Sequence, residues 1–188
     1  MRLLNTLGKF FGSGGIADFW KPGPPGVLWN GAWTNVGTYT YEAKLGGSPL
    51  VPPVFVSASN EQPGGECHLV FQTSNWYSWK TEPYWFEVDL GQNYDIKQYK
   101  IGVDHVVEAS GPSSWALKGW VDGDRGGAST TLDSQAGYDG AQWHLAGHLL
   151  TLTPATPGVF RYLRLELVSA ADTWMYVNKV DFLVNSPP

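Results

Sequence analysis

Charged residues and cysteine are scarce in this sequence, and each scarcity excludes a class of protein. Asp, Glu, Lys and Arg make up only 15% of the 188 residues while 43% are hydrophobic, a balance that excludes an intrinsically disordered chain. Lys and Arg number 12, form no block and leave a net charge of −5, so we expect no nucleic-acid partner. The single cysteine, Cys67, excludes an intrachain disulfide and is interpreted as a small buried hydrophobic residue.

Long apolar runs are absent as well. No stretch approaches the roughly 20 apolar residues that cross a bilayer, so we expect no membrane span. Residues 3–11 place Leu and Phe on one side of a short amphipathic helix, whose apolar side could pack on the domain itself, a partner protein or a membrane interface. Residues 12–26 have the Gly/Pro composition of a linker. We therefore divide the chain into an N-terminal arm with its linker, residues 1–26, and a globular body, residues 27–188.

Apolar and polar residues alternate with period two along much of this body, which is typical of strands that place one face on a core. The clearest alternating runs are residues 84–90, 98–103, 115–121, 162–167 and 179–184. Runs at 53–58, 67–73 and 146–153 predict further strands of less definite register. Because no long helical pattern is present, the sequence predicts an all-β fold, a two-sheet jelly-roll β-sandwich preceded by a short arm.

Patterns of catalytic residues are missing, although aromatic residues are abundant. The ten Trp exceed the needs of a core this size, and a surplus of Trp is typical of a platform on which ligands stack. No G-x-S-x-G, H-E-x-x-H or P-loop pattern occurs, so we expect no enzyme. His144 and His148 are four residues apart, but the segment is interpreted as strand or loop, so we do not expect a helical metal-binding pair.

Several segments of the body resemble, in the right order, the discoidin family, also called the coagulation-factor type C domains. Residues 85–91 (WFEVDLG) resemble its W-x-x-V-D-L-G strand, and residues 111–123 (GPSSWALKGWVDG) resemble its P-S-S-W-x-L-x-G-S-x-D-G segment. Residues 160–165 (FRYLRL) look like its F-R-Y-L-R-L strand, and residues 177–182 are similar to its closing strand. The resemblance covers about residues 55–184 and implies a galactose-binding-domain-like jelly roll.

The resemblance also implies a mostly non-catalytic domain that binds carbohydrates, phospholipid head groups or proteins through loops at one end. It implies a structural calcium ion near the loop after the first core strand. In this chain residues 71–79 (FQTSNWYSW) replace the family wording F-D-G-x-x-x-T-x-W, and the Asp is absent. Because Ca²⁺ prefers several oxygen ligands that include carboxylates, calcium stays an open question and no cofactor is assigned.

If the family geometry holds, residues 72–83 and 104–114 face the same end of the sandwich. Sugar recognition needs an aromatic face for the ring and planar polar groups for the hydroxyls. The candidates that supply these groups are Asn75, Trp76, Tyr77, Trp79, Lys80, His105 and Glu108. Two alternatives stay open here: Trp79 could be a core residue, and the pair Asp104–His105 could cap a strand end.

Two further groups of residues have structural interpretations. A cluster around Tyr138, Asp139, Gln142, Trp143 and His144 is either a functional loop or a lid that packs on the sandwich. Arg161 and Arg164 are three residues apart in one predicted strand. They should therefore lie on opposite faces and not share a role, each pairing with a carboxylate of the sheet.

Taken with the resemblance, these features predict a non-catalytic carbohydrate-binding domain. The arm predicts attachment to a protein partner, so we expect an oligomer or part of a larger assembly. A phage virion fits this pattern, with the chain as a head fibre or tail component that grips cell-surface glycan and is located on a virion or outside cells. The alternatives are a structural protein–protein interaction domain with no glycan ligand and an unrecognised hydrolase.

Overall fold

The computed structural model describes residues 16–18, 32–71, 76–78, 83–106, 110–121, 123, 125–169 and 174–185. The strands of the N-terminal part are β1 (Ile16–Asp18), β2 (Ala32–Gly37), β3 (Thr40–Leu45), β4 (Ser48–Pro49), β5 (Phe55–Ala58) and β6 (Trp76–Ser78). The later strands are β7 (Tyr84–Gly102), β8 (Pro112–Trp120), β9 (Thr130–Ala136), β10 (Leu149–Leu152), β11 (Gly158–Ser169), β12 (Met175–Val177) and β13 (Lys179–Asn185). The helices are the 3₁₀ turn η1 (Cys67–Phe71) and α1 (Gly140–Leu145).

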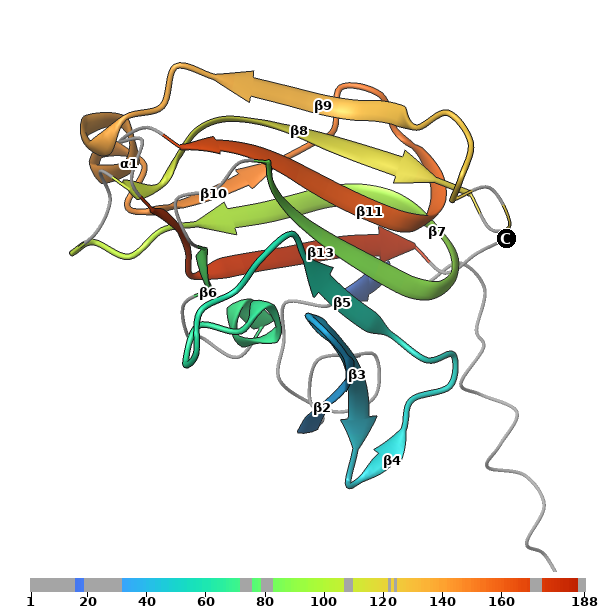
Figure 1. Cartoon of the computed structure of the whole chain (residues 1–188). Coiled ribbons are helices and arrows are strands. Elements are labelled where there is room, and N and C mark those ends of the chain that lie inside the picture. The colour runs from blue at the N-terminus through green and yellow to red at the C-terminus, as the bar shows by residue number, and fades with distance from the viewer. Residues whose placement is uncertain are drawn as a thin grey trace, which may run out of the picture.

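Strand β7 belongs to both layers of a sandwich. Its first half pairs with β5 and β11, and its second half pairs with β13 and β10. The first sheet therefore has the order β2-β3-β5-β7-β11-β8-β9, and the second has β10-β7-β13-β1. Figure 1 shows β7 turning back on itself between the two sheets.

Glycine is required where β7 bends. Gly91 has φ +80°, and a Cβ at this position would lie 2.4 Å from the carbonyl oxygen of Pro53. The Gly91 N–H donates to Asp89 Oδ1 at 2.8 Å and fixes the turn.

The core lies between the sheets and is formed by the inward residues of the alternating runs. Phe86, Val88, Leu163, Leu165 and Ile101 are all at most 2% exposed. The predicted all-β jelly-roll sandwich is confirmed, and the predicted runs at 53–58 and 146–153 contain β5 and β10. Cys67 is free and buried, as expected.

Two local predictions are wrong. Residues 67–71 form the helix η1 instead of a strand, because the Glu61 carboxylate accepts a hydrogen bond from the Cys67 N–H at 2.7 Å where the helix begins. Residues 140–145 form α1 instead of strand or loop. Asp139 and Gln142 form a capping box at the start of α1, which is a sequence signal that the period-two reading missed.

A buried hydrogen-bond network connects the two sheets. Tyr99 of the second sheet donates its hydroxyl proton to Asp133 Oδ2 of β9 at 2.6 Å and accepts from the Trp115 indole N–H at 3.0 Å. Burial, together with the bond to Asp133, raises the pKa of Tyr99 far above its usual value. The phenol therefore stays a proton donor, and the network holds β8 and β9 over the second sheet.

Part of the predicted arm joins the sandwich. Strand β1 pairs antiparallel with β13 at the edge of the second sheet, with Ala17 opposite Val184. The predicted helix at 3–11 and the boundary at residue 26 lie outside the described residues, so both stay predictions. In the described ranges no helix is both long and apolar enough to cross a membrane.

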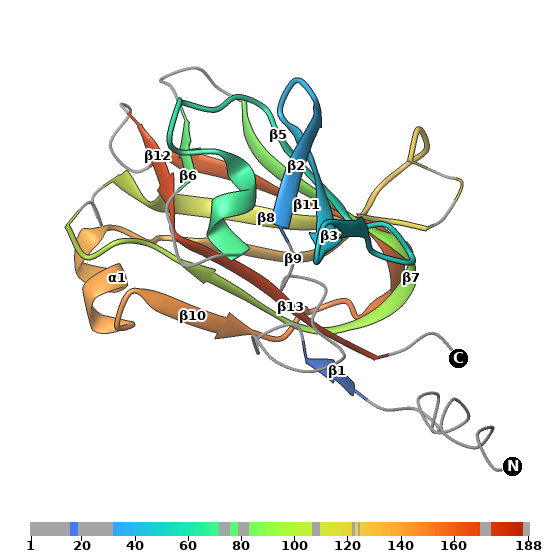
Figure 2. The same ribbon diagram turned by 90° about the horizontal axis from the view of Figure 1, so that it is seen from below.

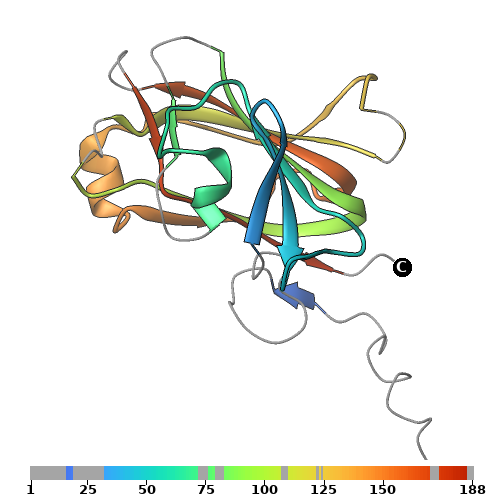
Figure 3. The ribbon, with the colours of Figure 1, turned by 60° about the horizontal axis from the view of Figure 1, so that its bottom comes forward.

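The two ends of the sandwich differ. Helix α1, β6 and β12 gather at the end where β7 begins and finishes, and β13 ends toward the other end (Figure 2). Figure 3 shows the same separation from a second direction, with α1 in orange. We call the end that carries α1 the loop end.

Candidate ligand-binding site

Most of the predicted site residues have side chains outside the described part of the chain. Those beyond the described ranges are Asn75, Trp79, Lys80 and Glu108. The backbone of Trp76 and Tyr77 forms β6, a short strand instead of the expected loop, because it pairs with Val177 and Tyr176 of β12. The ligand-binding role of these six residues stays a prediction.

His105 is the one predicted site residue whose side chain is described, and it is exposed. Its neighbour Asp104 accepts a hydrogen bond from the Val106 N–H at 2.8 Å and lies 3.3 Å from His105 Nδ1. Asp104 therefore caps the end of β7, which is the structural interpretation that the sequence left open for the pair Asp104–His105.

The structure brings other histidines to His105. Its ring centroid lies 6.2 Å from that of His148, which lies 5.5 Å from that of His144. These residues come from the segment after β7, from α1 and from the turn before β10, so their proximity has no signal in the sequence. Across the ranges that the structure describes, no three His, Cys, Asp or Glu side chains are placed to hold a metal ion.

The loop where the resemblance implies a calcium ion, residues 71–79, is described only at residues 71 and 76–78. Earlier in the chain, the buried Glu61 carboxylate forms contacts within the protein. Glu61 accepts hydrogen bonds from the Tyr41 hydroxyl at 2.9 Å and from the Cys67 N–H at 2.7 Å, one on each oxygen. Burial, and then the bond to Glu61, raises the pKa of Tyr41 and keeps its proton in place. Glu61 therefore has a structural role, and calcium binding at 71–79 stays an open question.

The aromatic cluster at 138–144 packs on the sandwich. Trp143 is fully buried, donates its indole N–H to the Pro112 carbonyl at 3.0 Å and stacks on Trp115 at a centroid distance of 5.7 Å. The ring centroid of Tyr138 lies 4.9 Å from that of Trp115. Of the two earlier interpretations, the lid is confirmed for these two aromatic residues.

A groove of about 590 Å³ opens on the outer face of the first sheet. Strand β8 points Trp115 inward and the small residues Ser114 and Ala116 outward, so it leaves space above the sheet. Trp85 of β7 and Glu166 of β11 border this space. Strands β7 and β8 begin and β11 ends beside the groove, so it lies at the loop end.

Arg164 borders the groove and is held from three sides. Its Nε and Nη2 donate to Glu87 Oε2 at 2.9 and 2.7 Å. Its guanidinium lies 4.4 Å from the centroid of the Trp85 ring and 5.5 Å from that of Trp120. A guanidinium fixed by stacking and by two hydrogen bonds to one carboxylate oxygen is a preorganised hydrogen-bond donor.

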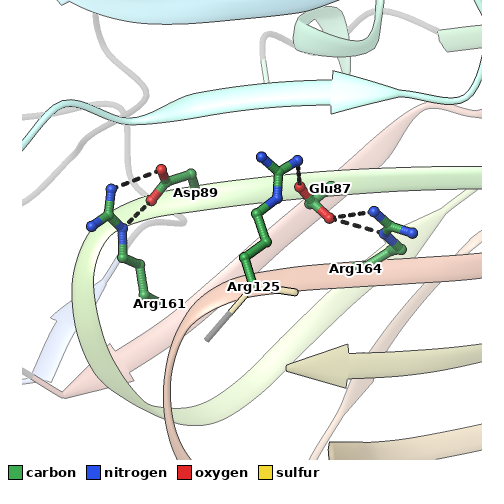
Figure 4. Close-up of polar contacts among 5 residues, drawn as sticks. All are labelled: Glu87, Asp89, Arg125, Arg161 and Arg164. Carbon is green, nitrogen blue, oxygen red and sulfur yellow. Dashed lines mark hydrogen bonds and ion pairs between the residues drawn. The ribbon is translucent and has the colours of Figure 1, made fainter. Parts of the chain in front are cut away.

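Arg164 is one of three arginines on this face, which we call the arginine row (Figure 4). Arg125 donates to Oε1 of Glu87, the oxygen that Arg164 leaves free, and Arg161 bonds both oxygens of Asp89 at 2.7 and 3.0 Å. Glu87 is only 3% exposed, so the two guanidinium groups that it binds lie over it.

The expectation that Arg161 and Arg164 lie on opposite faces is wrong. Their partners Asp89 and Glu87 are two residues apart in β7 and so share one face. The pairing of β11 with β7 is irregular between Phe160 and Tyr162, opposite the bend of β7, and there Arg161 turns to the side of Arg164. The expectation that each arginine pairs with a sheet carboxylate is confirmed.

The groove residues were missed by sequence reasoning, although their strands were predicted. Trp85, Ser114, Ala116 and Glu166 all occupy outward positions of alternating runs. The available signal was an outward Trp in one alternating run, Trp85, and two successive small outward residues in another, Ser114 and Ala116. Which strands lie next to one another, and hence whether these residues meet, depends on the sheet order β7-β11-β8.

Comparisons with known proteins identify the fold. No family model matches the chain, and no curated protein matches it. A chitosan-binding module from Paenibacillus sp. IK-5 is 20% identical with a TM-score of 0.56 and covers 68% of this chain and 92% of its own. A family 32 carbohydrate-binding module from Clostridium perfringens, solved with GalNAc-β-1,3-galactose, is 13% identical with a TM-score of 0.56 and covers 69% and 94%.

An F5/8 type C domain from Bacteroides fragilis matches equally well, at 13% identity and a TM-score of 0.56, covering 69% of this chain and 90% of its own. The body thus has the discoidin-type, galactose-binding-like fold that the sequence motifs predicted. At these identities the likeness establishes the fold and leaves the ligand to the chemistry of the site.

Proposed function

We propose that this chain is a non-catalytic carbohydrate-binding domain that holds its glycan in the outer-face groove at the loop end. One observation carries the proposal: Trp85 and the fixed guanidinium of Arg164 border a hollow floored by Ser114 and Ala116. An aromatic wall contacts the C–H faces of a sugar ring, while Arg164, Glu166 and Gln135 offer planar groups to its hydroxyls.

Proteins of the same fold support the ligand class. Solved structures that match this chain include carbohydrate-binding modules in complex with galactose, with 4,5-unsaturated mannuronic acid and with chitotriose. These ligands belong to those proteins, and their variety leaves the sugar of this chain to be found by experiment. The predicted residues of 72–83 adjoin the groove in sequence through Pro83, which lines it. They would extend the same binding surface.

The proposal includes a place in a larger assembly, such as a phage head fibre or tail on a virion or another extracellular particle. The apolar side of residues 3–11 supports it, because that side needs a partner. Deletion of residues 1–15 keeps β1 in place and should release the chain from its assembly, measured by particle association or oligomer size. An unchanged assembly would favour the body itself as the attachment surface.

A glycan array tests the binding function. We expect the wild type to bind at least one glycan class and Ala116→Trp, which fills the groove from its floor, to lose that binding. Ala155→Trp is the matched control, since Ala155 is an exposed residue of the turn between β10 and β11 and does not line the groove. If the wild type binds no glycan, the protein–protein interaction domain becomes the better account.

A further inference from the structure

We propose that the groove selects a glycan that carries an anionic group, which is bound by Arg164, a lining residue of the groove, and by Arg125, which shares the Glu87 carboxylate with Arg164. This inference rests on the proposed carbohydrate binding and names the chemical class of the ligand. It follows from the balance of charge, the accessibility of the guanidinium groups and their geometry.

Among the described side chains, those of the groove and those on the adjoining strands β7, β8 and β11 that pair with them, together with Arg125, carry an excess of positive charge. The cations are Arg125, Arg164 and Lys118, and the carboxylates are Glu87 and Glu166. Lys118 lies 2.6 Å from Glu166 and neutralises it, so the two arginines share the single carboxylate of Glu87. One positive charge remains among these described side chains, in a chain whose net charge is −5. The excess is therefore a local feature, opposite in sign to the protein as a whole.

An incoming ligand meets the cations before the carboxylate. Glu87 is 3% exposed, whereas the Arg125 side chain is 57% exposed. Arg125 donates to Glu87 through Nη2, and Arg164 through Nε and Nη2. A guanidinium carries five N–H donors in a planar fork that matches the two oxygens of a carboxylate or sulfate.

Arg161 provides an internal comparison. It lies in the same row but bonds both oxygens of its own carboxylate, Asp89, so this pair carries no excess charge. Arg164 lines the groove and Arg125 shares its carboxylate, whereas Arg161 does neither. Its guanidinium is of the same kind as those of Arg125 and Arg164, and only its charge environment and position differ.

Binding of the full chain to matched pairs of polysaccharides tests the inference. Polygalacturonate and alginate are titrated against their fully esterified, uncharged forms, and dextran sulfate against dextran, by calorimetry. We expect an acidic polymer to bind at least tenfold more tightly than its uncharged partner. Arg125→Gln should weaken that binding at least fivefold and reduce its salt dependence, whereas Arg161→Gln should leave it within twofold. The polymer pairs that show this difference, carboxylated or sulfated, identify the anionic group.

A failure of this inference can be distinguished from a failure of the proposed carbohydrate binding. Equal or tighter binding of an uncharged polymer would overturn the inference and leave the proposed carbohydrate binding intact. Acidic binding that is equally sensitive to Arg125→Gln and Arg161→Gln would also overturn it, since it would report a diffuse charge effect. If no polymer in any pair binds and the glycan array is also empty, the proposed function itself fails.

Discussion

Glu87 is the residue on which the outer face depends most. It is a buried carboxylate that binds one guanidinium on each oxygen. It thereby orients both Arg164, which lines the groove, and the more exposed Arg125. Removing one member of a buried ion pair leaves charges without a partner, which costs far more than losing an exposed pair.

The variant Glu87→Gln tests this role. Because Arg125 and Arg164 would lose their common anion, we expect the free energy of unfolding to fall by about 3 kcal/mol. Asp89→Asn is the matched control on the same strand and face. Its pair with Arg161 is more exposed, so we expect a loss of about 1 kcal/mol. Equal losses in urea denaturation would contradict a special role for Glu87.

A second residue with a measurable signature is Asp181 of β13. It is 1% exposed, and burial raises its pKa from 3.8 to about 6, although Lys179 at 2.9 Å and Lys100 on the neighbouring strand favour the charged form. Below about pH 4 the carboxyl is protonated in both the folded and the unfolded chain. As pH rises from about 4 to about 6, the unfolded chain loses its proton first, so stability falls, and above about pH 6 the loss is complete.

The ionisation of Asp181 therefore lowers the free energy of unfolding by about 3 kcal/mol at pH 7 relative to pH 4. Asp181→Asn lacks this contribution. We expect the difference in unfolding free energy, variant minus wild type, to increase by that amount between pH 4 and pH 7, because other titrating groups are common to both proteins. A difference independent of pH would show that Asp181 has an ordinary pKa.

At the scale of the elements, β7 determines the architecture, because its first half belongs to one sheet and its second half to the other. The bend at Gly91 packs against Pro52 and Pro53, which follow β4 and precede β5. The approach is close enough to exclude a side chain. The positive φ and the close contact thus both require glycine.

Gly91→Ala should destabilise the protein by about 3 kcal/mol, because the new methyl group clashes with the backbone of Pro53 and alanine disfavours this φ. Gly137→Ala isolates the second effect, since Gly137 has φ +84° and nothing within 4 Å of the added Cβ. We expect a loss of about 1 kcal/mol there. Similar melting temperatures for the two variants would mean that the contact with Pro53 relaxes without cost.

The sequence predicted the positions of the strands better than the contacts between them. Alternation located the long strands because each has one face on the core, as in 84–90 and 162–167. It missed the irregular pairing at Arg161, since the bend of the neighbouring strand β7, and not the pattern of β11 itself, interrupts the alternation there. It also missed η1, where a tertiary contact from Glu61, and not the local pattern, determines the conformation.

For the molecule as a whole, the prediction of the binding site was coarser than that of the fold. The resemblance indicated loops at one end of the sandwich as the binding site, which stays a prediction, whereas the proposed groove opens at the loop end. The residues that form it come from β7, β8, β9 and β11, and only the order of the strands brings Trp85, Ser114 and Arg164 together. The groove is thus a property of the assembled sheet, as is the shared carboxylate that fixes its arginines.

At this scale the central claim is that glycan lies in the outer-face groove. The most direct measurement is an NMR titration of the ¹⁵N-labelled tryptophan indoles with the glycan that binds most tightly on the array. We predict that the Trp85 indole resonance shifts with the binding isotherm, while that of the buried Trp143 stays in place. Shifts confined to Trp76 and Trp79, with Trp85 unchanged at saturation, would contradict the account and place the ligand on the segment at 72–83 instead.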